Sequence, residues 1–198
     1  MTSRFPDDTE LDAIAAQVRS FTPLANGELS SLLDDARRSP TGPATGRLVE
    51  QLLGAVLDAV LARRERGVDL FDLYQEGSVA ATVAVGEYAA RGGAAPGLRA
   101  YVGRVVETFL DDVIKRAAAQ RLADTLLIEQ MKLLEVAEVA LRRRLEREPT
   151  TLELAAALEW VPETVEVVAA ALRQARDAYD AEIVDFLDDV DGGETPDV

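Results

Sequence analysis

The most abundant side chains of this chain that can do acid–base or metal chemistry are carboxylates, and the sequence contains no histidine and no cysteine. A Ser-His-Asp triad, a thiolate nucleophile and a His/Cys zinc site are therefore excluded. The abundant Asp and Glu residues form no grouping beyond that of solvated helix faces. A calcium loop around Gly192 fails on spacing, since Leu187 falls where the first Asp ligand is required. We expect no enzyme activity, no metal site and no cofactor.

The most informative polar residues lie in the stretch 69–88, DLFDLYQEGSVAATVAVGEY. Asp72, Gln75 and Glu76 fall in the first turns of a predicted helix, where the N-terminal partial charge favours acidic groups. Apolar residues recur there at spacings of three and four, which predicts one buried stripe. The residues of this stripe are Phe71, Tyr74, Val79, Val83 and Ala84. By spacing alone, the stretch is a capped amphipathic helix.

The elements around this stretch are also predicted to be helical. Hydrophobic residues make up 48% of the chain and aromatic residues only 5%, which indicates an all-α protein with a core of Ala, Leu and Val. Periodicity predicts helices over 8–20, 24–38, 47–67, 69–88, 99–122 and 123–148, a short helix after Thr150 and another from Pro162. The expected segments are N-terminal helices over 1–40, a helical domain over 41–122, a second over 123–176, and an acidic tail over 177–198.

The charge of the chain argues against tight nonspecific binding of nucleic acid. The net charge is −15, and nine acidic residues but no Lys or Arg follow from Asp177 onward. Phosphate backbones are bound by clustered Lys and Arg. No apolar run reaches membrane-spanning length, and the start MTSRFPDDTE lacks the apolar stretch of a signal peptide. We therefore expect a cytoplasmic protein that binds no membrane.

The letters FDLYQEGSVAATVAVGEY resemble the core-polymerase-binding helix of the bacterial sigma-70 family, whose usual form is LDLIQEGNxGLxxAVxxF. Matching or conservatively replaced positions are Phe71, Asp72, Leu73, Gln75, Glu76, Gly77, Ala84, Val85 and Tyr88. The family's Asn is Ser78 here. The resemblance implies binding to core RNA polymerase, at its clamp helices. The implied contact residues are Phe71, Asp72, Gln75, Glu76, Ser78 and Thr82.

Other parts of the chain resemble further regions of the same family. Residues 24–38 resemble region 1.2, and RLVEQLLGAVLDAVLARRERG resembles the first helix of region 2. REPTTLELAAALEWVPETV resembles region 3. The resemblance thus implies a region-2-like helical bundle, followed by a region-3-like helix-turn-helix domain of three helices. The acidic tail resembles the linker after region 3, with a disordered solubilising tail as the alternative. No counterpart of region 4 is expected in this chain.

The segment that melts promoter DNA in the family is degenerate here. Alignment on Tyr101 puts Arg104 and Val105 where the family has an aromatic pair, and valine offers no π-face for a base. The implied, weakened DNA-binding residues are Arg99, Tyr101 and Arg104. We expect lost −10 recognition and melting, with little or no DNA binding by the chain alone. Two functions remain open: a sigma-like transcription regulator bound to core polymerase, or a decoy that binds an anti-sigma factor or another regulator.

Overall fold

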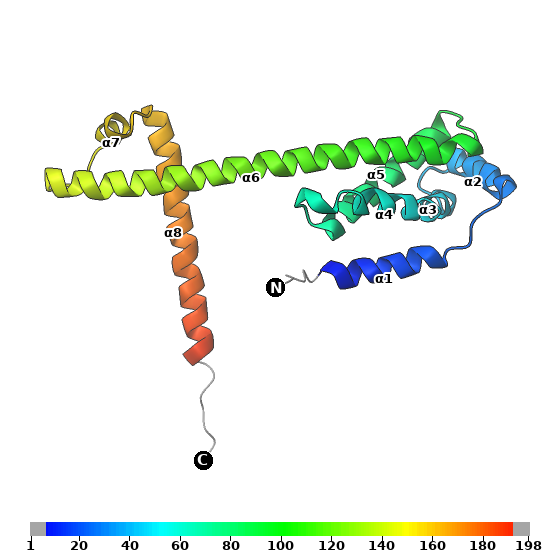
Figure 1. The fold of residues 1–198 in the computed structure, drawn as a ribbon, viewed down its shortest axis with the longest axis horizontal. Coiled ribbons are helices and arrows are strands. Elements are labelled where there is room, and N and C mark those ends of the chain that lie inside the picture. The colour runs from blue at the N-terminus through cyan, green and yellow to red at the C-terminus, as the bar shows by residue number, and fades with distance from the viewer. Residues whose placement is uncertain (1–6, 192–198) are drawn as a thin grey trace, which may run out of the picture. The chain divides into compact units, whose positions relative to one another are not determined.

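A computed structural model describes residues 7–191, and these residues form eight α-helices and no strand (Figure 1). The all-α prediction is confirmed. In order the helices are α1 (Asp7–Ser20), α2 (Asn26–Arg38), α3 (Pro43–Glu50), α4 (Leu53–Leu61), α5 (Leu70–Ala90), α6 (Leu98–Leu145), α7 (Thr151–Leu158) and α8 (Pro162–Asp191). The chain divides into two compact units, residues 1–119 and 120–198. α1 and α2, expected as part of a separate segment, pack into the core of the first unit.

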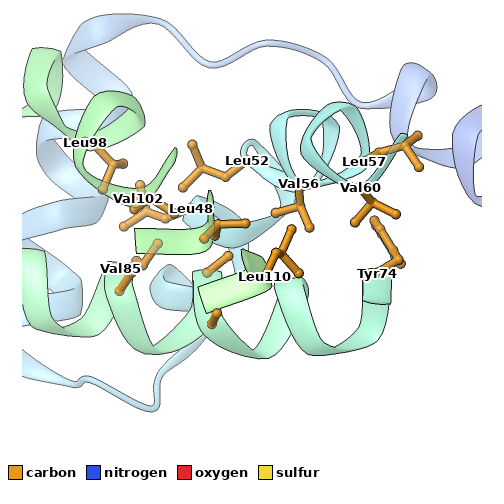
Figure 2. Packing of buried hydrophobic residues seen from close by; sticks show 14 of the residues in the cluster. Leu48, Leu52, Val56, Leu57, Val60, Tyr74, Val85, Leu98, Val102 and Leu110 are labelled. Carbon is orange, nitrogen blue, oxygen red and sulfur yellow. The ribbon is translucent and has the colours of Figure 1, made fainter. Parts of the chain in front are cut away.

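The core of the first unit is built from Leu, Val and Ala side chains of α1 to α6. Leu48 of α3 and Val56 and Val60 of α4 are buried against α5 and the first turns of α6. Figure 2 shows these side chains together with Val85 of α5 and Leu110 of α6. Full burial of aliphatic side chains contributes roughly 1.5–3 kcal/mol each, so this cluster is the main source of stability in the unit.

The helix predicted over 47–67 is two helices in the structure. α3 ends at Glu50, α4 begins at Leu53, and the chain turns through Gln51 and Leu52. At this turn the Gln51 side chain binds the connection between α1 and α2. It accepts a hydrogen bond from the Leu24 N–H at 3.0 Å and donates one to the Thr22 carbonyl at 3.2 Å. The Gln51 side chain, at the turn between α3 and α4, therefore holds the connection between α1 and α2 against the first unit.

Two helices were predicted over 99–122 and 123–148, but α6 is one helix of 48 residues from Leu98 to Leu145 (Figure 1). No Pro or Gly occurs between residues 104 and 148 to interrupt it. The helix ends where Glu146 adopts a positive φ of 55° and Pro149 follows. The division between the two units falls at residue 119, within this helix.

The second unit consists of the later part of α6 with α7 and α8. Leu134 and Leu141 of α6 pack with Leu154 of α7 and Val165 and Val168 of α8. Trp160, in the turn between α7 and α8, is partly buried and packs against this cluster. α8 continues to Asp191, so the expected tail is helical over 177–191, and its last residues, 192–198, lie outside the described part of the chain.

Glu153 closes the first turn of α7, and this arrangement has a consequence for acid stability. Arg147 donates two hydrogen bonds to its carboxylate, at 2.6 and 3.0 Å, and the Thr150 N–H donates a third at 2.8 Å. Thr150 Oγ1 in return accepts from the Glu153 N–H, which completes a capping box. These bonds, that of Arg147 foremost, lower the pKa of Glu153 to about 2.

We expect the second unit to lose stability as the pH falls below about 4.5, the ordinary pKa of glutamate, towards 2. The native state holds the Glu153 carboxylate ionised, so the unfolded state binds the proton first and is favoured by acid. Glu153→Gln should flatten this part of the pH dependence, whereas Glu166→Gln on the surface of α8 should leave it unchanged. Thermal unfolding followed by circular dichroism at pH 5 and pH 2.5 measures both. An unchanged slope in Glu153→Gln would contradict the assignment.

Candidate functional site

α5 positions the residues that the sequence singled out. Its N-terminus is fixed by Asp69, whose side chain accepts a hydrogen bond from the Asp72 N–H at 2.8 Å. One side of the helix is buried in the first unit, and most of its residues are small. The buried residues are Leu73, Tyr74, Gly77, Ala80, Ala81, Ala84, Val85 and Ala89. Small side chains let α2, α3 and α4 approach α5 closely, and the opposite side of α5 faces solvent.

The outer face of α5 is formed by Asp72, Gln75, Glu76, Val79, Thr82 and Val83, which follow one another at spacings of three and four. Asp72, Gln75, Glu76 and Thr82 are exposed. Val79 and Val83 are exposed to 61% and 57%. The predicted buried stripe was therefore wrong at these two valines, because Gly77, Ala80 and Ala81 occupy the core side in their place.

The remaining predicted contact residues are less available than the rest. Phe71 is half-buried at the start of the helix and Ser78 is half-buried in its third turn. The Ser78 hydroxyl donates to the Tyr74 carbonyl at 2.8 Å, and the Thr82 hydroxyl donates to the Ser78 carbonyl at 2.9 Å. Both hydroxyl hydrogens are thus used within the helix, and only their oxygen lone pairs remain for a partner.

The electrostatic character of α5 is uniform, because its 21 residues include no Lys or Arg. Asp72 and Glu76 place two carboxylates at its N-terminal end, beside the exposed valines. Glu87, at the other end, already accepts hydrogen bonds from Arg91 at 3.2 Å and Tyr101 at 3.1 Å. The outer face can therefore bind a surface that offers basic side chains next to an apolar patch.

The three predicted DNA-binding residues are not brought together. Arg99 lies on the opposite side of α6 from Tyr101, because residues two positions apart in sequence differ by about 200° around a helix axis. The Tyr101 ring packs on Tyr88, with centroids 5.1 Å apart, and its hydroxyl is bound to Glu87 and Arg91. Arg99 and Arg104 are exposed. This arrangement provides no free aromatic face next to a cluster of basic residues.

Carboxylates also occupy the same part of α6. Arg63, at the end of α4, donates to the Asp111 carboxylate at 2.9 Å and to the Ala59 and Glu107 carbonyls. Its hydrogen bond holds the pKa of Asp111 below the usual value. Arg63 therefore caps α4 and links it to α6, as expected of a structural arginine, and is not available to a phosphate.

Sequence reasoning missed two features of the site. The first is the exposure of Val79 and Val83, which the spacing from Asp72 and Glu76 along the same face would have indicated. The second is Arg37 of α2, which donates to the Ala89 carbonyl at 2.9 Å and to the Gly93 carbonyl at 2.7 Å. Arg37 thereby caps the C-terminus of α5 across 52 residues of sequence, a distance at which no local pattern gives a signal.

Comparison with known proteins assigns no family to the chain. No family model matches it, and a search of curated proteins gives no match. Within residues 7–191, no helix is both long enough and apolar enough to cross a membrane. The resemblance to the sigma-70 family therefore rests on the sequence motifs alone.

Proposed function

We propose that this chain is a sigma-70-like transcription regulator that binds core RNA polymerase through the outer face of α5. The observation that carries the proposal is the exposure of Asp72, Gln75 and Glu76 in the helix whose letters resemble the polymerase-binding helix of that family. The two carboxylates would meet basic residues of the clamp helices, and Val79 and Val83 would be buried between them.

In this proposal the chain docks on polymerase without opening promoter DNA itself. Melting a duplex requires aromatic side chains that stack on unpaired bases. Tyr101 is packed on Tyr88, and Val105 stands where the family has an aromatic residue. The turn and helix of the second unit, which resemble region 3, present Glu163 and Glu166 near the start of α8, where phosphate would be repelled.

The proposal is tested by measuring the affinity of the full chain for purified core polymerase. The double variant Asp72→Lys with Glu76→Lys should weaken binding by at least about a hundredfold, because two attractive charge contacts become repulsive. Val79→Asp should weaken it by about tenfold or more through the buried apolar contact. The matched control, Glu163→Lys with Glu166→Lys, makes the same change in net charge on the surface of α8. It should bind normally.

Two results would contradict this function. The first is failure of the unaltered chain to bind core polymerase at micromolar concentrations, and the second is equal binding by the α5 variant and the α8 control. Binding to an anti-sigma factor that is lost in the same α5 variant, without binding to polymerase, would instead identify a decoy.

A further inference from the structure

The second unit exposes an apolar strip along one side of α6. Leu133 and Val136 are exposed to 54% and 68%, and Val139 and Ala140 are exposed beside them. The core of the unit lies on another side of the helix, through Leu134 and Leu141. Exposed apolar surface of this kind marks interaction sites in soluble proteins. The described part of the chain leaves this strip uncovered.

The two ends of the strip carry opposite charges at equal distances from its centre, and a third exposed charge, Lys132, lies between Glu129 and Val136. Glu129, Val136 and Arg143 are seven residues apart, so they lie within about 40° of one another around the helix. Glu129 and Arg143 are therefore each about 10 Å along the axis from Val136. Both are exposed, and neither has an ion-pair partner among the described residues.

The positions of Glu129 and Arg143 are complementary to each other when a second copy is turned end for end, and Lys132 then lies opposite Ala140 of that copy. We propose that α6 pairs with α6 of a second copy in an antiparallel dimer, with Val136 on the twofold axis. Glu129 of each copy then lies beside Arg143 of the other, and Leu133 packs against Val139 and Ala140. Such an interface is isologous, so every contact occurs twice. A different apolar partner would not require opposite charges equally spaced about Val136.

The size of the strip indicates a weak dimer. Contact along a single helix pair is smaller than the roughly 800 Å² per partner of a standard stable interface. We expect a dissociation constant of about 10–100 µM. At lower concentrations the chain is a monomer, and α5 plays no part in the pairing.

The charge pairs are tested by sedimentation equilibrium of the full chain over a range of concentrations. Arg143→Glu should weaken the dimer by about tenfold or more, because both symmetric pairs become repulsive, and Glu129→Arg should do the same. The double variant, Glu129→Arg with Arg143→Glu, restores both attractions and should dimerise like the original chain. Arg173→Glu, a matched change on α8, should have no effect. A monomer at all concentrations up to about 1 mM, well above the expected constant, or a double variant as weak as the single ones, would overturn the proposal.

The antiparallel direction is tested separately by cross-linking, since the chain has no cysteine of its own. Packed helix axes are 8–10 Å apart, which brings residues on the twofold axis within reach of a disulfide. Val136→Cys should therefore form a disulfide-linked dimer on mild oxidation. Two copies of Thr125→Cys would lie about 33 Å apart along the axis and should remain monomeric. Cross-linking through Thr125→Cys as readily as through Val136→Cys would show a parallel pair and overturn the proposal.

Discussion

Leu110→Ala is expected to lower the free energy of unfolding of the first unit by about 2–5 kcal/mol. The Leu110 side chain is completely buried, near Val56 of α4 (Figure 2). It also lies against Gly77 of α5. Its removal leaves a cavity that the surrounding helices can fill only in part, so packing contacts are lost in addition to the transfer free energy. Urea unfolding followed by circular dichroism measures the loss.

The same substitution at Leu61 is the matched control. Leu61 belongs to the same unit but is 40% exposed at the end of α4, so Leu61→Ala should change the free energy by no more than about 0.5 kcal/mol. A loss below about 1 kcal/mol in Leu110→Ala would show that this part of the core is less well packed than the structure indicates.

Gly77→Leu is expected to destabilise the first unit by about 3 kcal/mol, at the upper end of the usual overpacking penalty. A Cβ atom at residue 77 would lie 2.9 Å from Val56 Cγ1 and 3.3 Å from Leu110 Cδ2, so α4 and α6 would have to move away from α5. Leucine is a better helix former than glycine by up to about 1 kcal/mol, which offsets only part of this cost.

Gly86 provides the internal comparison, because it lies in the same helix with nothing within 4 Å of a Cβ placed there. Gly86→Leu should therefore leave the unit equally stable or stabilise it by up to about 1 kcal/mol. The two substitutions thus act in opposite directions within one helix. Equal melting temperatures for the two variants would contradict the close approach of the helices at Gly77.

The helices themselves could largely be predicted from the sequence, since apolar residues at spacings of three and four indicate a helix wherever the core lies. Which side of α5 faces the core could not be predicted. Valine is more hydrophobic than alanine, and the pattern placed Val79 and Val83 inside, whereas close helix packing selects Gly77, Ala80 and Ala81 for the core. The turn at Gln51 was also missed, because its partners Thr22 and Leu24 are 29 and 27 residues away.

In the candidate site, too, features set within one helix could be predicted, whereas contacts with residues of other elements could not. The exposed positions of Asp72, Gln75 and Glu76 agree with the sequence, since acidic residues in the first turns of a helix face water. The environment of Tyr101 depends on Tyr88, Glu87 and Arg91, which come from α5 and the loop after it. Whether an aromatic ring is free to stack is set by such neighbours, and no spacing along α6 reveals them.

The position of Trp160 gives the chain a built-in optical probe. It is the only tryptophan in the sequence, and it packs against the core of the second unit. Three of the four tyrosines, Tyr74, Tyr88 and Tyr101, belong to the first unit. Selective excitation of the indole ring therefore follows the unfolding of one unit without any label, and a shift in its emission reports water reaching the turn between α7 and α8.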